Sequence, residues 1–210
     1  TLIAEKTNDC LASIHIDAAG LIRLGETNDD RLENFNHLIL RAESLGGNIM
    51  IPTFSYTYPK RVEFNLLETP SEVGIITEYV RKKNPLKRTA DGMFSYLLFN
   101  SDPNSHYYDI GDYEIFGDNS LIGELFNKNG YICCVGGVFH NTPTEVHFLE
   151  RLLNVPYRFH KIMSGEFIDK NGKSHLQNLL FFCRDLDSHL DSDMTILEKD
   201  LRVENLFEYW

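Results

Sequence analysis

Short apolar runs alternate with segments of helical periodicity along most of this 210-residue chain. Residues 12–16, 48–54, 94–99 and 131–135 have the length and composition of buried strands. Residues 32–45 carry apolar side chains at the spacing of an amphipathic helix, and a Gly-Gly pair follows them. Such alternation is typical of α/β proteins, in which helices cover the faces of a largely parallel sheet.

Two segments have the sequence of a helix start. Thr69-Pro-Ser-Glu72 and Thr142-Pro-Thr-Glu145 each offer a threonine at the N-cap, a proline at the first helical position and a glutamate three residues after the cap. We therefore expect a helix from each, the second one reaching Leu153. Asn119-Ser120 precedes a further helical segment and is most simply its cap. The alternative is that free backbone N–H groups there bind an anion such as a cofactor phosphate.

The pattern changes beyond residue 160. Two extended runs are joined there by Lys170-Asn-Gly-Lys173, and Asn-Gly is a strong signal for a β-hairpin. The sequence thus predicts the α/β fold class. We expect a single three-layer α/β/α-like domain over residues 1–210, with a mixed sheet and a C-terminal antiparallel hairpin.

The charge balance restricts the partners. Thirty-one Asp and Glu residues against twenty Lys and Arg give a net charge of -11. This argues against duplex nucleic acid and anionic lipid, because phosphate binding relies on clustered Lys and Arg. No run approaches the ~18 apolar residues of a membrane-spanning helix. We therefore expect no nucleic-acid partner and no membrane span, whereas a cationic small molecule is compatible with the charge.

The spacing of the cysteines favours a reducing environment. The spacing of the cysteines and histidines argues against a metal site. Cys10, Cys133, Cys134 and Cys183 show neither a CxxC pair nor the spacing of a disulfide framework. The chain also shows no recognisable secretory signal, so a cytoplasmic location fits best. No Cys/His pair has metal-ligand spacing, and the histidines do not form an HExxH motif.

The segment from Cys134 to Glu150 is the most informative for chemistry. It has the pattern of a strand, a glycine-bearing loop and a helix, and ligands in α/β proteins usually bind where a strand's carboxyl end meets a helix start. Thr144, His147 and Glu150 share one helix face. A histidine with a carboxylate at i+3 suits a general base. From spacing alone the plainer alternative is favoured, in which the histidine caps a core edge and the glutamate is solvated.

Six segments occur in this chain in an order that matches one enzyme family. They are Ile51-Pro-Thr-Phe-Ser-Tyr56, Thr69-Pro-Ser-Glu-Val-Gly74, Arg88-Thr-Ala-Asp-Gly-Met-Phe-Ser95, Phe116-Gly-Asp-Asn-Ser120, the stretch from Gly136 to Glu150, and Val155-Pro-Tyr-Arg158. From about residue 14 to 187 the chain resembles the aminoglycoside 3-N-acetyltransferases, whose fold is distinct from the GNAT fold. The resemblance implies acetyl-CoA as donor and an amino sugar as acceptor. Family members continue past residue 210, so we expect the family's C-terminal end to be missing here.

The resemblance also implies roles for individual residues. His147 matches the catalytic histidine of the family's Thr-x-x-His-x-x-Glu motif, and Glu150 and Asp193 are expected to support it, with Asp191 as the alternative to Asp193. The residues expected to line the cofactor site are His15, Ser95, Ser120 and Thr144. The residues expected to bind the acceptor are Tyr56, Asp91 and Asn141. From the residues alone, His15 in its strand is equally well a core histidine or a pocket residue.

These roles imply a direct transfer. A neutral imidazole, which titrates near pH ~6.5 when unperturbed, takes a proton from the acceptor's ammonium, and the free amine attacks the thioester. The expected function is acetyl-CoA-dependent N-acetylation of an aminoglycoside or amino sugar. Asp91-Gly92 stands where the resistance enzymes usually carry His-Pro, and in this the chain looks more like members from polysaccharide gene clusters. The alternative is therefore a non-catalytic or differently acting relative in surface-polysaccharide biosynthesis that keeps the fold for sugar or CoA binding. A homodimer is left open.

Overall fold

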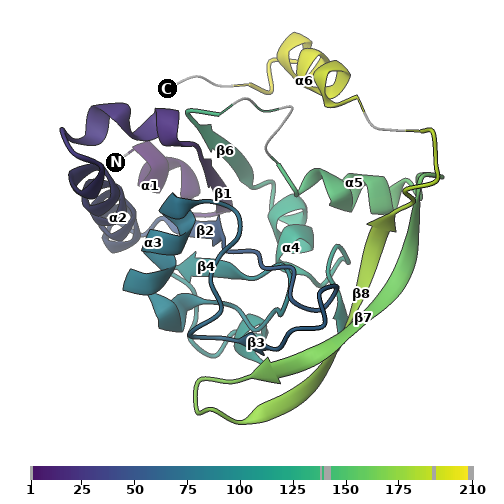
Figure 1. The fold of residues 1–210 in the computed structure, drawn as a ribbon. Helices are drawn as coiled ribbons and strands as arrows, with labels where there is room; N and C mark the ends of the chain where they lie inside the picture. The colour runs from purple at the N-terminus through teal and green to yellow at the C-terminus, as the bar shows by residue number, and fades with distance from the viewer. Residues whose placement is uncertain (1, 138, 140–142, 191–192, 208–210) are drawn as a thin grey trace.

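The computed structural model describes residues 2–137, 139, 143–190 and 193–207, whose arrangement is shown in Figure 1. The α-helices are α1 (Leu2–Thr7), α2 (Asn28–Ser44), α3 (Ile75–Lys83), α4 (Leu121–Asn127), α5 (Val146–Leu152) and α6 (Met194–Val203). The strands are β1 (Leu11–Ile16), β2 (Asn48–Pro52), β3 (Phe64–Asn65), β4 (Tyr96–Phe99), β5 (Tyr113–Glu114), β6 (Tyr131–Val135), β7 (Arg158–Ile168) and β8 (Ser174–Arg184). Short 3-10 helices within the described residues are η1 (Ala18–Leu24), η2 (Pro85–Lys87) and η3 (His106–Tyr108). The predicted α/β fold class is confirmed.

The first sheet has the strand order β4-β2-β1-β6. β1 is parallel to β2 and β6, whereas β2 is antiparallel to β4, so the sheet is mixed. Successive side chains of β2 point to opposite faces. Ile49 and Ile51 pack among residues of α2 and α3, and Met50 packs into a second core on the other face.

The second sheet is built on the C-terminal hairpin, with the order β3-β7-β8-β5. β7 and β8 pair antiparallel over their full length, from Arg158 opposite Arg184 to Ile168 opposite Ser174. The predicted Asn-Gly turn is confirmed. Gly172 has φ +79°, a conformation that glycine adopts without steric cost, and the Asp169 carboxylate accepts from two backbone N–H groups of the loop.

The larger core joins the two sheets. Met50 and Leu98 of the first sheet pack in one cluster with α4 and α5 and with Phe167, Leu179 and Phe182 of the second. The helices α2 and α3 cover the opposite face of the first sheet, and the hairpin lies at the far edge of the molecule (Figure 1). This packing brings the start of α5 against the carboxyl end of β1.

The helix starts agree with the sequence in part. The helix predicted over residues 32–45 begins four residues earlier, because Thr27 and Asp30 form a capping box before α2. Gly46, at φ +89°, follows its end as expected. Ser120 is the N-cap of α4, and its hydroxyl accepts from Gly123 N at 3.1 Å, so the plain capping interpretation is confirmed.

The prediction that a helix starts at Thr69 is wrong. α3 begins only at Ile75, after Gly74 at φ +128°, and it has no side-chain N-cap. The Thr69 hydroxyl accepts instead from Asn65 N at 2.7 Å and closes a turn, while Glu72 pairs with Lys60 at 2.5 Å. Both expected capping side chains are thus engaged in other contacts.

The second predicted helix start also differs from the structure. Thr142 lies outside the described residues, and α5 begins at Val146 with Glu145 at the N-cap position and no side-chain cap. The Glu145 carboxylate turns inward to the first sheet instead of back along its own helix.

Two further findings concern the whole described chain. All four cysteines are free thiols. Among the described residues, no helix is long and apolar enough to cross a membrane.

Candidate active site

A buried polar cluster lies where β1 meets the start of α5. Alternation along β1 points Ser13 and His15 to one face of the sheet, while Ile14 enters the core on the other. Because a carboxylate only accepts, His15 Nε2 donates to Glu145 Oε2 at 2.8 Å, and Ser13 Oγ donates to Glu145 Oε1. Tyr96 of β4 adds a hydroxyl 3.3 Å from the same Oε1 atom. All four residues are buried.

This cluster has the residue types of a Ser-His-Glu triad but not its geometry. In such a triad the histidine contacts the serine through one ring nitrogen and the carboxylate through the other. Here Ser13 and Glu145 both face the same nitrogen, Nε2, at 3.3 and 2.8 Å. The Ser13 hydroxyl donates to the carboxylate, which is the wrong direction for activation as a nucleophile.

A second His–Glu pair lies on α5 itself. His147 Nδ1 is 2.5 Å from Glu150 Oε2, as the i, i+3 spacing predicts. The Glu150 side chain is nearly buried, whereas 26% of the His147 side chain is exposed. With Nδ1–H donating to the carboxylate, Nε2 of a neutral ring carries no proton and can act as an acceptor. The Arg158 guanidinium lies beside the ring, 3.0 Å from Nδ1 and 3.4 Å from Nε2.

Three neighbours hold the Glu150 carboxylate in place. Besides His147, Arg158 of β7 lies with Nε 2.8 Å from Oε2, and the Tyr157 hydroxyl donates to Oε1 at 2.9 Å. Burial acts to raise the pKa of Glu150. The hydrogen bond from His147, the Arg158 charge and the Tyr157 hydroxyl outweigh it and hold the pKa below its usual value. Glu150 is therefore an anion fixed behind the imidazole.

Aromatic rings surround the exposed edge of this pair. Phe116 meets the His147 ring edge to face at 5.3 Å, and Phe94 and Phe181 lie within 6 Å of Phe116. Tyr56, more than a third exposed, packs edge to face on Phe94 at 5.9 Å. A chain of rings thus connects two of the predicted site residues, Tyr56 and His147.

The residues predicted for the cofactor differ in accessibility. Thr144 is half-buried, and its carbonyl oxygen accepts from His147 N at 3.0 Å. Ser120 is engaged as the α4 cap. Ser95 is fully buried, where its hydroxyl donates to Thr53 O at 2.9 Å and accepts from Arg88 Nε at 2.9 Å. His15 belongs to the buried cluster.

The other predicted residues are not brought to His147 by any described contact. Asp91 is buried, and its carboxylate accepts from the backbone N–H groups of Met93 and Phe94 at 2.7 and 2.6 Å. Burial raises its pKa despite these bonds. Asp193 caps α6 through Thr195 N at 3.0 Å. Asn141 and Asp191 lie outside the described residues.

Two contributors to the site carry no recognisable signal in the sequence. Glu145 has the pattern of a capping box, and Arg158 stands out only as part of a family motif, so the sequence predicts neither contact. His15 and Glu145 are 130 positions apart, which leaves no local spacing signal for that pair. A glutamate beside the helix that carries His147 was the available hint.

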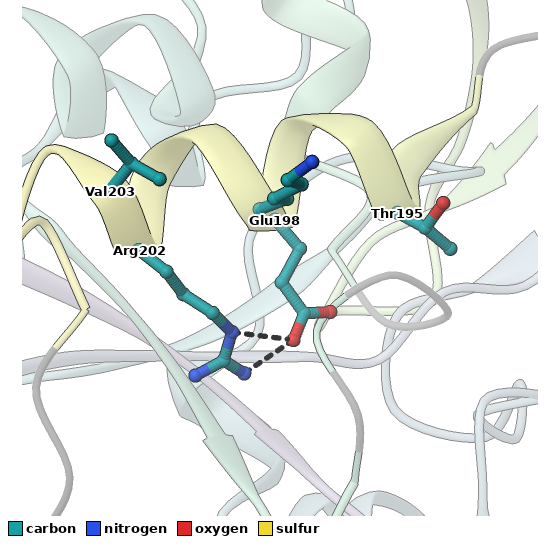
Figure 2. Close-up of a pocket in the computed structure, with 5 residues that line it drawn as sticks. Thr195, Glu198, Arg202 and Val203 are labelled. Atoms are coloured by element: carbon teal, nitrogen blue, oxygen red, sulfur yellow. Dashed lines mark hydrogen bonds and ion pairs between the residues drawn. The ribbon is translucent and has the colours of Figure 1, made fainter.

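Two hollows on the surface lie away from His147. One of about 430 Å³ lies beside α6 and is lined by Thr195, Glu198, Lys199, Arg202 and Val203 (Figure 2). Another of about 290 Å³ lies near the amino end of β1 and includes Cys10, Asn48 and Glu124. No predicted site residue that the structure describes lines either hollow. Nor do the described residues contain a group of three or more His, Cys, Asp or Glu placed to hold a metal ion.

Several solved structures share this fold. "AAC-VIa bound to Sisomicin" has a TM-score of 0.68 at 15% identity, covering 95% of this chain and 81% of that one. The YokD protein from Bacillus subtilis has a TM-score of 0.64 at 15% identity, covering 96% and 86%. An alanine mutant of the aminoglycoside acetyltransferase AAC(3)-IVa in complex with apramycin has a TM-score of 0.62 at 16% identity, covering 97% and 76%. At these identities the likeness establishes the fold.

The family follows from the sequence itself. The model of the aminoglycoside 3-N-acetyltransferase family matches residues 38–207, most of the chain, so this protein belongs to that acetyltransferase family. The resemblance found from the motifs is thereby confirmed. No curated protein sequence matches significantly.

Proposed function

We propose that this protein is an acetyl-CoA-dependent N-acetyltransferase that acts on an amine of an aminoglycoside or amino sugar by direct transfer. The observation that carries the proposal is the His147–Glu150 contact of 2.5 Å. It joins a partly exposed imidazole to a nearly buried carboxylate. Membership of the family supplies the reaction class.

His147 acts as the general base in this proposal. The acceptor amine is mostly an ammonium at neutral pH, and His147 Nε2 takes one of its protons. Glu150 stabilises the imidazolium that results, because its carboxylate stays on Nδ1–H. The acetyl thioester supplies the carbonyl carbon to which the amine nitrogen bonds as the C–S bond breaks. His147 then returns this proton to the departing sulfur, and the nitrogen releases its second proton to solvent as the amide forms, so the imidazole ends the cycle neutral as it began.

The described residues fit the thioester end of acetyl-CoA. The partly exposed Phe181, packed on the buried Phe116 that meets the imidazole, gives an apolar surface near His147, which suits an acetyl group and excludes water from the reacting atoms. Thr144, half-buried and one turn from His147, is the predicted cofactor residue best placed for contact. The Ser120 hydroxyl caps α4. Ser95 and His15 are buried, so they would act on the cofactor site from within the protein and not by direct contact.

The acceptor is proposed from charge and shape. A net charge of -11 favours a polycationic amino sugar. Tyr56 offers an exposed ring on which a sugar can pack, and the Glu72 carboxylate lies within 3.4 Å of the Tyr56 backbone nitrogen. We retain Asn141 and Asp91 as proposed acceptor residues; Asp91 would act through the backbone of 93 and 94, which its carboxylate fixes. A cytoplasmic location is supported by the four free thiols.

An acceptor screen tests the function. Free thiol release from acetyl-CoA is followed with aminoglycosides, simple amino sugars and nucleotide-linked amino sugars. We expect turnover with at least one class, abolished or strongly reduced in His147→Ala. A thermal-shift titration with CoA runs beside it, since ligand at a hundred times Kd stabilises by ~2.7 kcal/mol. Failure of both, in folded protein, contradicts the proposed function.

A matched control is available on the hairpin. His175 Nε2 lies 3.1 Å from Asp169, and 29% of its side chain is exposed, so it copies the chemistry and exposure of His147 far from α5. His175→Ala should retain near-native turnover. Equal loss in both variants would show that the assay does not report on a specific base.

A further inference from the structure

α5 is a short helix with an unusual start. It has seven residues and begins without a side-chain cap, because the Glu145 side chain at its N-cap position is turned toward β1. Isolated helices of this length are not stable in water, so tertiary contacts must hold it. The position of His147, two residues after Glu145, depends on those contacts.

Polar contacts from three strands hold α5. At its start, Glu145 accepts from Ser13 and His15 of β1. On its outer side, Arg151 donates two hydrogen bonds to the Glu114 carboxylate of β5, both at 2.8 Å. Near its end, Glu150 pairs with Arg158 of β7. Only the first of these contacts is completely buried on the carboxylate side.

We propose that Glu145 and His15 form a positioning pair that fixes the place and orientation of the His147 imidazole. The inference rests on the proposed function for its kinetic part. A buried ion pair is a poor source of stability, because desolvation offsets its attraction, but it is selective for one geometry. The pair fixes the backbone of α5 at the residue where helix and sheet meet. Neither residue touches the reacting atoms in this role.

The pair should act on turnover rather than on binding. Misplacing a catalytic group by about 1 Å can cost on the order of 10²-fold in rate. Glu145→Gln keeps the size of the side chain and one oxygen acceptor but removes the charge that faces His15. We expect kcat to fall by about 10- to 100-fold, while KM for acetyl-CoA changes little.

The decisive readout is independent of activity. In ¹⁵N-histidine-labelled protein, the ring signals of His147, assigned with His147→Ala, report whether Nδ1–H still donates to Glu150. We expect those signals to shift in Glu145→Gln and in His15→Ala. His15→Gln should restore them in part, because its amide can still donate to Glu145.

Glu78→Gln is the matched control. The Glu78 carboxylate of α3 also lies 2.7 Å from a buried cationic side chain, that of Arg81, but on the opposite face of the first sheet. This variant should lose stability and leave the His147 signals and kcat unchanged. Should Glu145→Gln fail to fold, the His15→Ala and His15→Gln comparison decides alone.

The outcomes separate this inference from the proposed function. If Glu145→Gln and His15→Ala lower the Tm but leave the His147 ring signals unchanged, the pair is structural only and the inference is overturned. If wild-type protein shows no turnover with any acceptor, the proposed function fails, and the ring signals still decide whether the pair positions His147. Shifted ring signals with unchanged kcat would overturn the kinetic part.

Discussion

The molecule contains two His–Glu pairs that differ in one physical respect, burial. The Glu145 side chain is fully buried and its partner His15 nearly so, whereas His147 keeps 26% of its side chain exposed with Glu150 behind it. In both pairs a ring nitrogen faces a carboxylate at hydrogen-bond distance. Residue type alone therefore does not separate a catalytic pair from a supporting one. Access to solvent does, because a base must reach its substrate's proton.

The two pairs are joined through α5. Glu145 stands directly before the helix and Glu150 near its end, so one short element carries a carboxylate of each pair. The buried pair connects the helix to the first sheet, and the exposed pair connects it to the hairpin through Arg158. Changes in the two pairs should accordingly be felt in different measurements.

The sharpest test of the comparison is His147→Ala. Loss of a positioned general base should lower kcat by about 10²- to 10⁴-fold, while the affinity for CoA stays nearly intact. Steady-state kinetics with the best acceptor and a CoA thermal-shift titration measure both quantities. The rise of kcat/KM with pH expected for a working imidazole should disappear in the variant.

The prediction has a clear opposite result. If His147→Ala keeps near-native turnover and an unchanged pH profile in folded protein, the exposed pair is a surface contact, as spacing alone favoured. The comparison between the two pairs would then lose its functional half.

Glu145→Ala should produce the largest loss of stability. Removing the Glu145 carboxylate leaves the His15 and Ser13 donors without their acceptor in the protein interior, at a cost of about 1–3 kcal/mol for each unsatisfied donor. Glu150→Ala should cost less, since 26% of the His147 side chain is exposed and its ring can turn toward solvent. Urea unfolding of both variants under identical conditions measures the difference. Equal losses would mean that burial does not distinguish the pairs.

Acid should weaken the buried pair in a defined direction. Burial acts to raise the pKa of Glu145, but the His15 charge and the hydrogen bonds from His15 and Ser13 outweigh it, so the pKa lies below its usual value. A carboxyl with a depressed folded-state pKa contributes stability above its unfolded pKa of ~4.3 and loses it as pH falls through the folded value. The stability difference between wild type and Glu145→Gln should therefore shrink below about pH 4.3. A difference that is constant from pH 5.5 to 3 would contradict this.

Local signals in the sequence were enough for part of this site. His147 and Glu150 meet because residues three apart share a helix face. Ser120 caps α4 because a serine hydroxyl at the N-cap readily accepts a hydrogen bond from a backbone N–H of the first helical turn. The Asn-Gly hairpin depends likewise on neighbouring residues. Each of these features is decided within a few residues of chain.

The features that the sequence could not supply depend on competing hydrogen-bond partners. Thr69 and Glu145 have the pattern of capping boxes, but the Thr69 hydroxyl accepts from Asn65 N, four residues earlier, and the Glu145 carboxylate accepts from β1. For Glu145, hydrogen bonds from buried donors outweigh a solvent-exposed cap, which is worth only ~1 kcal/mol. For the same reason the pairing of His15 with Glu145 appears only once β1 and α5 are brought together.

The two helix starts beside the site offer the smallest and most discriminating prediction. α4 is capped by the Ser120 hydroxyl on Gly123 N, whereas α5 relies on Glu145 and β1. Ser120→Ala should cost about 1 kcal/mol of unfolding free energy, and Ser120→Gly only a few tenths, because a glycine N-cap leaves the first N–H groups open to water. The proposed role of Ser120 in binding the cofactor adds a second measurement, KM for acetyl-CoA. If the Ser120 hydroxyl also binds acetyl-CoA, both variants should raise KM for acetyl-CoA by a similar factor, although their stabilities differ. If KM is unchanged in both, Ser120 serves only as the cap, and contact with the donor is left to Thr144.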